Sequence, residues 1–273
     1  MDGLFDSKII PVNENCDWVQ LWRGISTTER DQVGGILVIC PHNSHLDAFP
    51  GPCVDGIPVG MLPASGGGEI TPWLDALRKT SRRSTHVLAM WKPFYLGWGE
   101  RFVAALQAGY GRSEAPVVAQ FADTTTKEDL CASLWKGPQL VIYLGHGRSR
   151  GWSGYRGLRW HHIASGEQVQ PVGTLIALTC DNLKPGRSGE TAFGLRWVME
   201  GRAKTFLGAI QEVEITAMEV IAEYLLGHFS DGRCRLLGEL IAAVDRDVQL
   251  SGEAAIQKNW SYFRLVGNPL EVL

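Results

Sequence analysis

Two residues that can do chemistry follow short apolar segments near the middle of the chain. His146 comes shortly after the apolar segment 140–144, and Cys180 directly after the segment 174–179. Each segment is short, rich in β-branched residues and bounded by Gly or Pro, which is typical of a buried strand. If the two strands are parallel neighbours, both side chains emerge at the same carboxyl edge of the sheet, where open α/β sheets bind their ligands.

A thiol and an imidazole at one edge could perform nucleophilic catalysis. A cysteine attacks only as the thiolate, and a free cysteine with a pKa of about 8.5 is mostly protonated at neutral pH. A neighbouring imidazole can take that proton or stabilise the anion. In this interpretation Cys180 attacks a peptide carbonyl, and His146 protonates the leaving amine and later helps to activate water. Taken alone, each residue also has a structural interpretation, as a small core side chain or as part of a turn.

The elements that would position this pair alternate between helix and strand. This alternation predicts an α/β fold, a three-layer sandwich with a mostly parallel central sheet flanked by helices. Residues 48–70, rich in Pro and Gly, are predicted to be loop. Further strands are expected at 35–41, 85–90, 203–210 and 262–266, and helices at 71–78, 99–109, 126–135, 188–200, 216–228 and 235–248.

Two of these helices carry recognisable start signals. Thr71 is the expected N-cap of its helix, with Pro72 at the first helical position. Thr126 is expected to cap the helix that leads into the histidine strand, because Glu128 and Asp129 suit its first turn. No internal repeat or linker divides the chain. We therefore predict one domain over residues 1–273, with 1–34 as an irregular N-terminal extension.

Composition excludes several classes of function. The chain has 273 residues, 45% of them hydrophobic, and a net charge of −3, so no basic excess suggests nucleic acid as a partner. No window approaches the roughly 18–20 apolar residues of a membrane span. The N-terminus has neither the basic nor the apolar region of a signal peptide. Together with six cysteines that form no CxxC pair, this predicts reduced thiols and a cytoplasmic protein.

Neither a metal site nor a cofactor is predicted. His42, His45 and Asp47 lie close together in the sequence and could be imagined as metal ligands, but no further ligands follow at a matching spacing. A loop is the favoured interpretation of that segment.

The motifs around His146 and Cys180 resemble those of the caspase-like (clan CD) cysteine peptidases. The resemblance is closest to the gingipain-type (C25) family and more distant to the CHAT peptidases. It rests on a strand followed by His-Gly, a second strand followed by Cys, Trp152 after the first motif and Gly189-Glu190 after the second. The terminal segment 262–270 is similar to the family's closing strand and Gly-Asp-Pro turn, with Asn268 in place of the Asp. Residues 110–273 carry the resemblance, and the first hundred carry little of it.

The resemblance implies a caspase-like fold and a cysteine endopeptidase with a His146/Cys180 dyad. It further implies an oxyanion hole formed by the backbone N–H groups of Gly147 and Cys180, and a protein or peptide as substrate. Glycine at position 147 would let the substrate backbone approach closely. Because an unregulated protease would be toxic, we expect activation by a protein or ligand activator or by self-cleavage, in a bacterial stress or defence cascade.

The substrate pocket is predicted to favour Arg or Lys before the scissile bond. Acidic residues hold such side chains in gingipains, and the candidates here are Asp47 and Asp181. Trp152 matches a gingipain tryptophan that helps to wall the pocket, and an aromatic face beside a carboxylate suits a guanidinium. Arginines crowd the same loop and could bind an acidic substrate residue instead, or could simply be solvated; they are Arg148, Arg150, Arg156 and Arg159.

Two other functions remain as alternatives. A nucleotide- or phosphate-binding α/β domain would use the glycines at 145, 147 and 151, but these miss the GxGxxG spacing, and the Lys-Ser/Thr pair of a P-loop is absent. A catalytically silent caspase-like interaction module would keep the fold without the reaction. Labelling of Cys180 by an active-site thiol probe would separate an enzyme from both.

Overall fold

The computed structural model describes most of the chain from residue 33 onwards. The described residues are 33–40, 46, 49, 51–64, 67–110, 115–167, 169–186 and 189–273. Gly34–Leu273 forms one compact unit, and residues 1–33 group separately from it. The predicted division into a single domain with an N-terminal extension stays a prediction.

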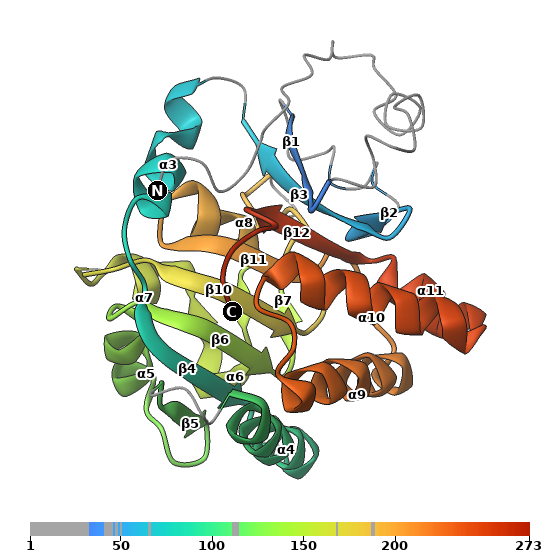
Figure 1. Cartoon of the computed structure of the whole chain (residues 1–273). Coiled ribbons are helices and arrows are strands. Elements are labelled where there is room, and N and C mark those ends of the chain that lie inside the picture. Colours follow the sequence, from blue (N-terminus) through green and yellow to red (C-terminus); the bar gives the residue numbers. More distant parts are fainter. Residues whose placement is uncertain are drawn as a thin grey trace. The chain divides into compact units, whose positions relative to one another are not determined.

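A nine-stranded sheet forms the centre of this unit within the described residues. Its order is β1-β3-β12-β11-β10-β6-β4-β5, with β2 paired to β3 (Figure 1). The strands are β1 (Ile36–Cys40), β2 (Cys53–Val54), β3 (Ile57–Pro63), β4 (Arg82–Ala89), β5 (Val117–Phe121), β6 (Pro138–Leu144), β10 (Val172–Leu178), β11 (Ala203–Ala209) and β12 (Phe263–Gly267).

The sheet contains two parallel blocks that run in opposite directions. Strands β5, β4, β6, β10 and β11 are mutually parallel, and β12 pairs antiparallel with β11. Strands β3 and β1 then run parallel to β12. The predicted mostly parallel sheet is confirmed. The five strands of the first block all end at the same edge of the sheet, which we call the carboxyl edge.

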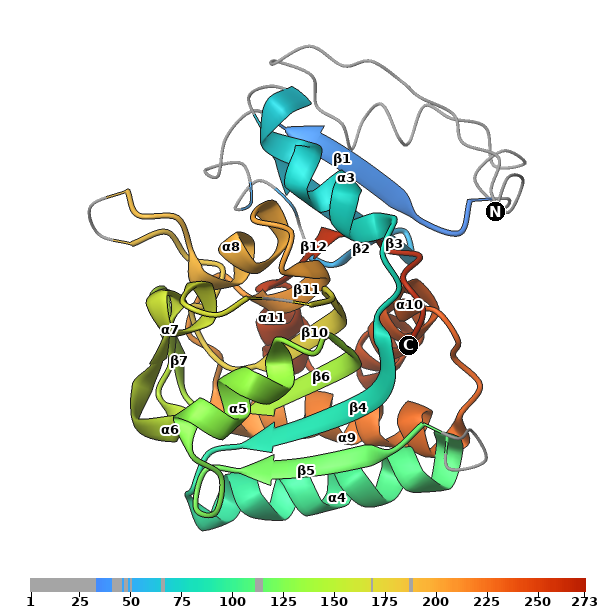
Figure 2. The same cartoon turned by 90° about the vertical axis from the view of Figure 1, so that its left-hand side faces the viewer.

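Helices cover both faces of the sheet, so that the predicted three layers are confirmed (Figures 1 and 2). One face shares a buried apolar core with α4 (Pro93–Tyr110), α9 (Ile215–Asp231), α10 (Leu237–Ser251) and α11 (Ala254–Trp260). The other face carries α3 (Thr71–Leu77), α5 (Lys127–Leu134), α7 (Trp160–Ala164) and α8 (Phe193–Met199). Short elements complete the described part, namely η2 (Gly67–Ile70), α6 (Gly154–Gly157) and the small sheet of β7 (Gly147–Arg148), β8 (Gly151–Trp152) and β9 (Leu158–Arg159).

The predicted N-cap is confirmed at one helix and wrong at another. Thr126 caps α5 as predicted, because its hydroxyl accepts the N–H of Asp129 at 3.1 Å. Thr71 is wrong as the N-cap of α3. The capping position is Ile70, which offers no side-chain hydrogen bond, and the Thr71 hydroxyl donates to the Gly67 carbonyl instead.

The prediction of a loop over 48–70 is wrong for its second half. Residues 57–63 form β3, a mostly buried strand between β1 and β12. Its Pro and Gly residues concealed the strand in the sequence, yet Gly60 has a structural reason. A Cβ atom there would lie 2.2 Å from the Gly267 carbonyl oxygen of β12. Strand β5 and helix α11 were not predicted, and α4 begins at Pro93 rather than at Gly99.

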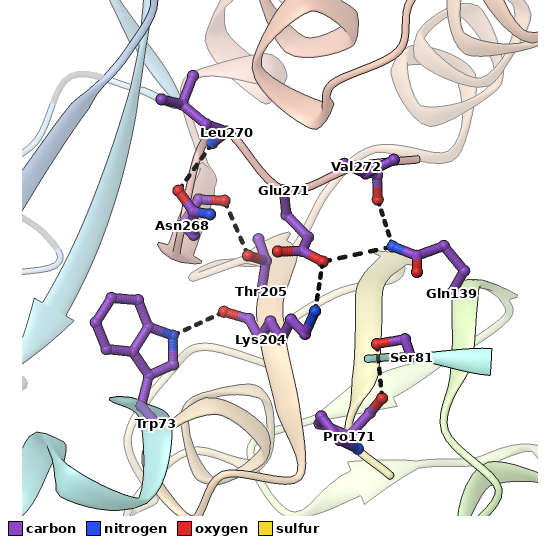
Figure 3. A network of polar contacts seen from close by, with 10 residues as sticks. All are labelled: Trp73, Ser81, Gln139, Pro171, Lys204, Thr205, Asn268, Leu270, Glu271 and Val272. Atoms are coloured by element: carbon purple, nitrogen blue, oxygen red, sulfur yellow. Dashed lines mark hydrogen bonds and ion pairs between the residues drawn. The ribbon is translucent and has the colours of Figure 1, made fainter. Parts of the chain in front are cut away.

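A buried ion pair fixes the sheet at the edge opposite the carboxyl edge (Figure 3). Lys204, near the start of β11, places its Nζ atom 3.1 Å from Glu271 Oε1, and the two residues are only 8% and 7% exposed. The Gln139 amide donates to the same carboxylate at 3.4 Å and to the Val272 carbonyl at 2.7 Å. The indole of Trp73 donates to the Lys204 carbonyl at 2.9 Å. These bonds join the end of the chain to β6, β11 and α3.

The described residues also bear on membrane crossing and on the state of the cysteines. No helix there combines the length and the apolar character that crossing a membrane requires. The described cysteines are all free thiols, and all except the half-buried Cys180 are buried.

The buried ion pair yields a prediction about stability. Lys204→Met should lower the free energy of unfolding by about 3–5 kcal/mol, because it leaves the Glu271 carboxylate buried without its cation. Adding Glu271→Leu should restore most of that loss, since two apolar side chains then replace the pair. Urea denaturation of the three proteins measures both effects.

The control for this experiment is an exposed ion pair. Arg78 lies 3.0 Å from Asp75 on the surface, and Arg78→Met should cost less than about 1 kcal/mol. Equal losses in Lys204→Met and Arg78→Met would contradict the stabilising role of the buried pair.

Candidate active site

His146 and Cys180 lie at the same edge of the sheet. Strands β6 and β10 are parallel neighbours, and their last residues, Leu144 and Leu178, are directly paired in register. His146 follows β6 and is exposed, whereas Cys180 follows β10 and is half-buried. The predicted arrangement of two adjacent strands that end at the carboxyl edge is therefore confirmed.

Two residues that follow β4, the strand on the other side of β6, contact the imidazole of His146. Lys92, between β4 and α4, places Nζ 3.1 Å from His146 Nε2. Tyr95, in the first turn of α4, places its hydroxyl 3.3 Å from Nδ1, and the two rings meet edge to face. An ammonium group can only donate, so Nε2 accepts and the ring proton resides on Nδ1.

The surroundings of His146 favour its neutral form. Burial lowers the pKa of the imidazole first, and the positive charge of Lys92 lowers the pKa further. A pKa below its ordinary value of about 6.5 leaves the ring uncharged at neutral pH. A neutral imidazole is the form that can accept a proton from a thiol.

The Cys180 thiol is also held in its neutral form. Its Sγ atom accepts the N–H of Val213 at 3.4 Å and lies 3.7 Å from the Val213 carbonyl oxygen. Burial raises the pKa of the thiol, the Val213 N–H opposes this, and the negative charges of Asp181 and Glu212 raise the pKa further. No hydrogen bond joins His146 and Cys180, both of which the structure describes. Catalytic contacts are often long in free enzymes and tighten when substrate binds.

The loops that follow the two strands pack directly against each other. A Cβ atom on Gly147 would lie 2.3 Å from Thr179 Oγ1, 2.6 Å from Asn182 Nδ2 and 2.7 Å from the Cys180 carbonyl oxygen. The steric requirement for glycine here therefore comes from the cysteine loop rather than from the predicted approach of the substrate backbone.

Asn182 connects the two loops through buried hydrogen bonds. Its side chain is fully buried, its Nδ2 donates to the Arg148 carbonyl at 2.9 Å, and its Oδ1 accepts the Trp152 indole N–H at 2.8 Å. Buried polar groups lose free energy when they are left unpaired, so these bonds hold the histidine loop in one position relative to Cys180.

Trp152 supports the histidine loop from below. Its ring stacks on Tyr143 with centroids 4.1 Å apart, and the Tyr143 hydroxyl donates to the His146 carbonyl at 3.0 Å. Trp152 has no exposed surface. Its predicted role as a wall of the substrate pocket stays a prediction that this buried position does not support.

Of the two carboxylates predicted for the substrate pocket, the structure describes Asp181 but not Asp47. Asp181 follows the nucleophile candidate with a left-handed backbone (φ 57°), a conformation that Asp tolerates better than most residues, and lies 3.5 Å from Lys184 Nζ. Asp47 lies outside the described residues, as do His42 and His45. Strand β1, which precedes Asp47 in the chain, ends at the edge opposite the dyad, since β1 runs against β6 and β10.

Arg264 donates hydrogen bonds to the backbone of Leu46 and Phe49. This arginine is buried near the start of β12, beside the carboxyl edge of β11. Its Nε atom donates to the Leu46 carbonyl at 2.6 Å, and its guanidinium also donates to the Phe49 carbonyl. These two carbonyls therefore lie next to the antiparallel strand β12.

Sequence reasoning missed three residues that shape the site. Lys92 and Tyr95 carried a readable signal, because Lys92-Pro93 lies one residue beyond the predicted strand 85–90, whose carboxyl end belongs to the same edge. Asn182 carried none, since nothing local in the sequence shows that it is buried. In the described part of the chain, which does not include His42, His45 and Asp47, no group of three or more His, Cys, Asp or Glu side chains is placed for a metal ion.

The Asn182 connection can be tested by a double-mutant cycle. Asn182→Ala should cost about 1–3 kcal/mol, because it leaves the Trp152 indole N–H and the Arg148 carbonyl without their partner. Trp152→Phe keeps a ring over Tyr143 but removes the indole donor. Denaturant unfolding should give a coupling of about 0.5–3 kcal/mol between the two substitutions.

A second tryptophan provides the control for this cycle. The indole of Trp73 donates to the Lys204 carbonyl, at the other end of the sheet. Trp73→Phe should combine with Asn182→Ala additively, within about 0.5 kcal/mol. Additivity in both cycles would show that Asn182 does not join the loops.

Known structures share this fold. The Arg-specific cysteine proteinase gingipain R aligns with a TM-score of 0.66 and 12% identity, over 94% of this chain and 67% of that chain. A complex of the pro- and mature domains of RgpB from Porphyromonas gingivalis gives a TM-score of 0.63 and 11% identity, over 94% and 69% of the two chains. The separase–securin complex of Saccharomyces cerevisiae gives 0.57 and 15%, over 84% of this chain but only 15% of that one. At these identities the likeness shows the fold.

The sequence itself assigns the family. A comparison with curated protein sequences finds no match. The model of peptidase family C25 matches residues 63–273, which include both candidate catalytic residues and both of their loops. The match covers most of the chain and agrees with the caspase-like fold, so the chain belongs to peptidase family C25 and is a cysteine peptidase.

Proposed function

We propose that Cys180 is the nucleophile of this cysteine peptidase and that His146 is its general acid and base. One observation carries the proposal. The two residues follow adjacent parallel strands at one edge, and buried hydrogen bonds of Asn182 hold their loops together. Such fixed placement is what lets a nucleophile and a base act on one bound substrate.

The reaction begins from neutral partners. When a peptide binds, the Cys180 proton passes to His146 and the sulfur attacks the carbonyl carbon of the scissile bond. The resulting imidazolium gives that proton to the leaving amine, the C–N bond breaks and a thioester remains. His146, neutral again, takes a proton from water as that water attacks the thioester. The Cys180 thiol recovers its proton when the acid product leaves.

Backbone N–H groups would stabilise the oxyanion of each tetrahedral intermediate. The N–H of Cys180 has no acceptor among the described residues, so it remains available for a substrate oxygen. The second donor of the proposal is the N–H of Gly147, whose loop lies against Cys180. Losing one such donor typically lowers the rate by about 10²–10³-fold.

The proposal extends to a preference for Arg or Lys before the scissile bond. Gingipain R, which shares the fold, is described as Arg-specific. Asp181 is the described carboxylate next to the nucleophile, and its present partner Lys184 is largely exposed. The Lys184 side chain is 54% exposed and that of Asp181 only 18%, so a substrate cation that displaced Lys184 would take over the charge balance of a largely buried carboxylate.

Less can be proposed about the regulation and the location of the protein. One of the similar structures is a complex with a pro-domain and another is a complex with securin, so protein partners occur with this fold. The activator, the stress or defence cascade and the cytoplasmic location stay predictions for this chain. Full activity of the purified, uncleaved chain without additives would contradict the predicted activation step.

The two alternative functions receive less support. The glycine-containing segment after β6 continues into β7 and β8 rather than into a helix. A phosphate loop would need a helix N-terminus at that point. A catalytically silent interaction module conflicts with membership of a peptidase family. One result of the test below would nevertheless favour such a module.

The dyad is tested with fluorogenic peptides that carry Arg, Lys, Asp or Leu before the scissile bond. The wild type should hydrolyse the Arg and Lys peptides. Cys180→Ala and His146→Ala should each lower kcat by at least about 10³-fold, because nucleophile and base act as one unit. Asp181→Asn should reduce turnover of the Arg and Lys peptides without abolishing it.

Each result of the panel decides one part of the proposal. Turnover that survives Cys180→Ala would overturn the dyad. Hydrolysis after Asp would keep the dyad and overturn the pocket. If no peptide is cleaved, a peptide probe with a thiol-reactive group decides, because failure to label Cys180 would favour the silent module.

The resting protonation state can be tested by alkylation with iodoacetamide. A raised pKa means that the thiolate of Cys180 is scarce at neutral pH, so its alkylation rate should rise with a midpoint above the value of about 8.5 for free cysteine. Glu212→Gln removes one of the negative charges that raise this pKa and should lower the midpoint. Mass spectrometry of the Cys180 peptide across a pH series measures the rate.

Glu214→Gln is the matched control, because Glu214 is exposed close to Glu212 but is not among the causes of the raised pKa. Its midpoint should equal that of the wild type. Fast alkylation that is independent of pH between about 5 and 8 would instead show a preformed thiolate–imidazolium pair.

A further inference from the structure

Lys92 is a cation at the catalytic edge without a carboxylate partner among the described residues. Its exposed side chain reaches the His146 imidazole, with Nζ 3.1 Å from Nε2. The residues on either side of Lys92-Pro93 are Trp91 and Phe94, which are 54% and 40% exposed. A positive charge and two exposed aromatic side chains in one short segment suit a peptide that combines a carboxylate with apolar contacts.

Two other described cations near the dyad, Lys184 and Arg150, are already paired with acids. Asp181 lies 3.5 Å from Lys184, and Glu190 accepts from Arg150 at 3.2 Å. A lysine whose partner is a neutral imidazole gains little from that contact compared with a carboxylate, because hydrogen bonds between two ionised groups are the stronger ones. Lys92 is thus a described cation that contacts the His146 imidazole and that a substrate anion could approach without displacing an acid.

The proposed reaction indicates which substrate residue would meet Lys92. His146 protonates the leaving amine, so the residue that carries this amine lies beside the imidazole. That residue is the first one after the scissile bond. Lys92 contacts the same imidazole and therefore lies within reach of that residue's side chain.

We propose that Lys92 is a specificity-determining residue that selects substrates with Asp or Glu directly after the scissile bond. This inference rests on the proposed function, which it deepens. It is compatible with Arg or Lys before the bond, since the carboxylate of Asp181 and the ammonium of Lys92 would serve residues on opposite sides of the bond.

The arrangement also links recognition to proton transfer. His146 is contacted by Lys92 from the β4–α4 turn and by Tyr95 from α4, and the backbone of the next residue, Gly147, lies against the Cys180 segment. In the free enzyme the ammonium of Lys92 donates to Nε2 and opposes protonation of the ring. A substrate carboxylate that draws this ammonium away would remove the donor from Nε2, and the ring could then take up the thiol proton. The right substrate would in this way favour the imidazolium that the reaction needs.

The effect should be visible as a moderate selectivity. Exposed ion pairs are weak, and Lys92 is only partly shielded by its aromatic neighbours. We expect kcat/KM for a peptide with Asp after the scissile bond to exceed that for the Asn peptide by about three- to tenfold, at low ionic strength. Added salt should reduce the difference.

The experiment uses internally quenched peptides of one sequence that differ only in the residue after the scissile bond. Asp is compared with Asn, and Glu with Gln, in the full chain. In the wild type the acidic peptides should be cleaved faster. Lys92→Met should abolish the difference, and Lys92→Arg should keep most of it, because the charge remains. Lys92 is exposed, so neither substitution should unfold the protein.

The chain offers a matched control in a second lysine–histidine contact. Lys127, on α5, places Nζ 3.2 Å from His162 Nε2 and contacts neither member of the dyad among the described residues. Lys127→Met should leave the preference for Asp over Asn unchanged. A loss of preference in Lys127→Met as large as in Lys92→Met would reduce the effect to overall charge and overturn the inference.

The remaining outcomes separate this inference from the proposed function. Cleavage that depends on Cys180 but is equal for Asp and Asn would overturn the role of Lys92 and leave the dyad intact. A preference that persists in Lys92→Met would do the same. Cleavage that does not depend on Cys180 would overturn the proposed function, and the inference would fall with it.

Discussion

The parallel pairing of β6 with β10 is the constraint on which the rest of the site depends. Side chains that follow the paired residues Leu144 and Leu178 must emerge at one edge, whatever the loops beyond them do. The loops cannot then separate, because the Gly147 backbone contacts the cysteine loop and the Asn182 side chain satisfies buried groups of the histidine loop. The positions of two short strands thus determine the position of Cys180 relative to His146.

The pairing with β4 adds the electrostatic setting. Lys92 and Tyr95 follow β4 at the same edge and contact both ring nitrogens of His146. Burial and the charge of Lys92 lower the pKa of the imidazole, while burial and nearby carboxylates raise the pKa of the Cys180 thiol. Both shifts favour the uncharged forms of the two side chains in the free protein.

Sequence reasoning succeeded where the physical signal was local. The strands before His146 and Cys180, the capped helix α5 and the alternation of elements were all readable, since each depends on residue types a few positions apart. It failed where contacts between distant segments decide the structure. Strand β3 is a strand because Gly60 lets it lie against β12, and Trp152 is buried because Asn182 and Tyr143 enclose it. Neither fact is written near those residues in the chain.

The reversal of direction at β12 gives the catalytic edge two kinds of border. On the β4 side of the dyad, the border consists of segments that leave strands, and these carry the histidine, the cysteine and Lys92. Beyond β11, the strands begin at this edge, so the border there consists of segments that enter strands, such as those held by Arg264 at Leu46 and Phe49. A change in length in the entering segments would alter the shape of that border without shifting either catalytic candidate. The architecture therefore separates the part that must stay constant for chemistry from a part that is free to diverge between relatives.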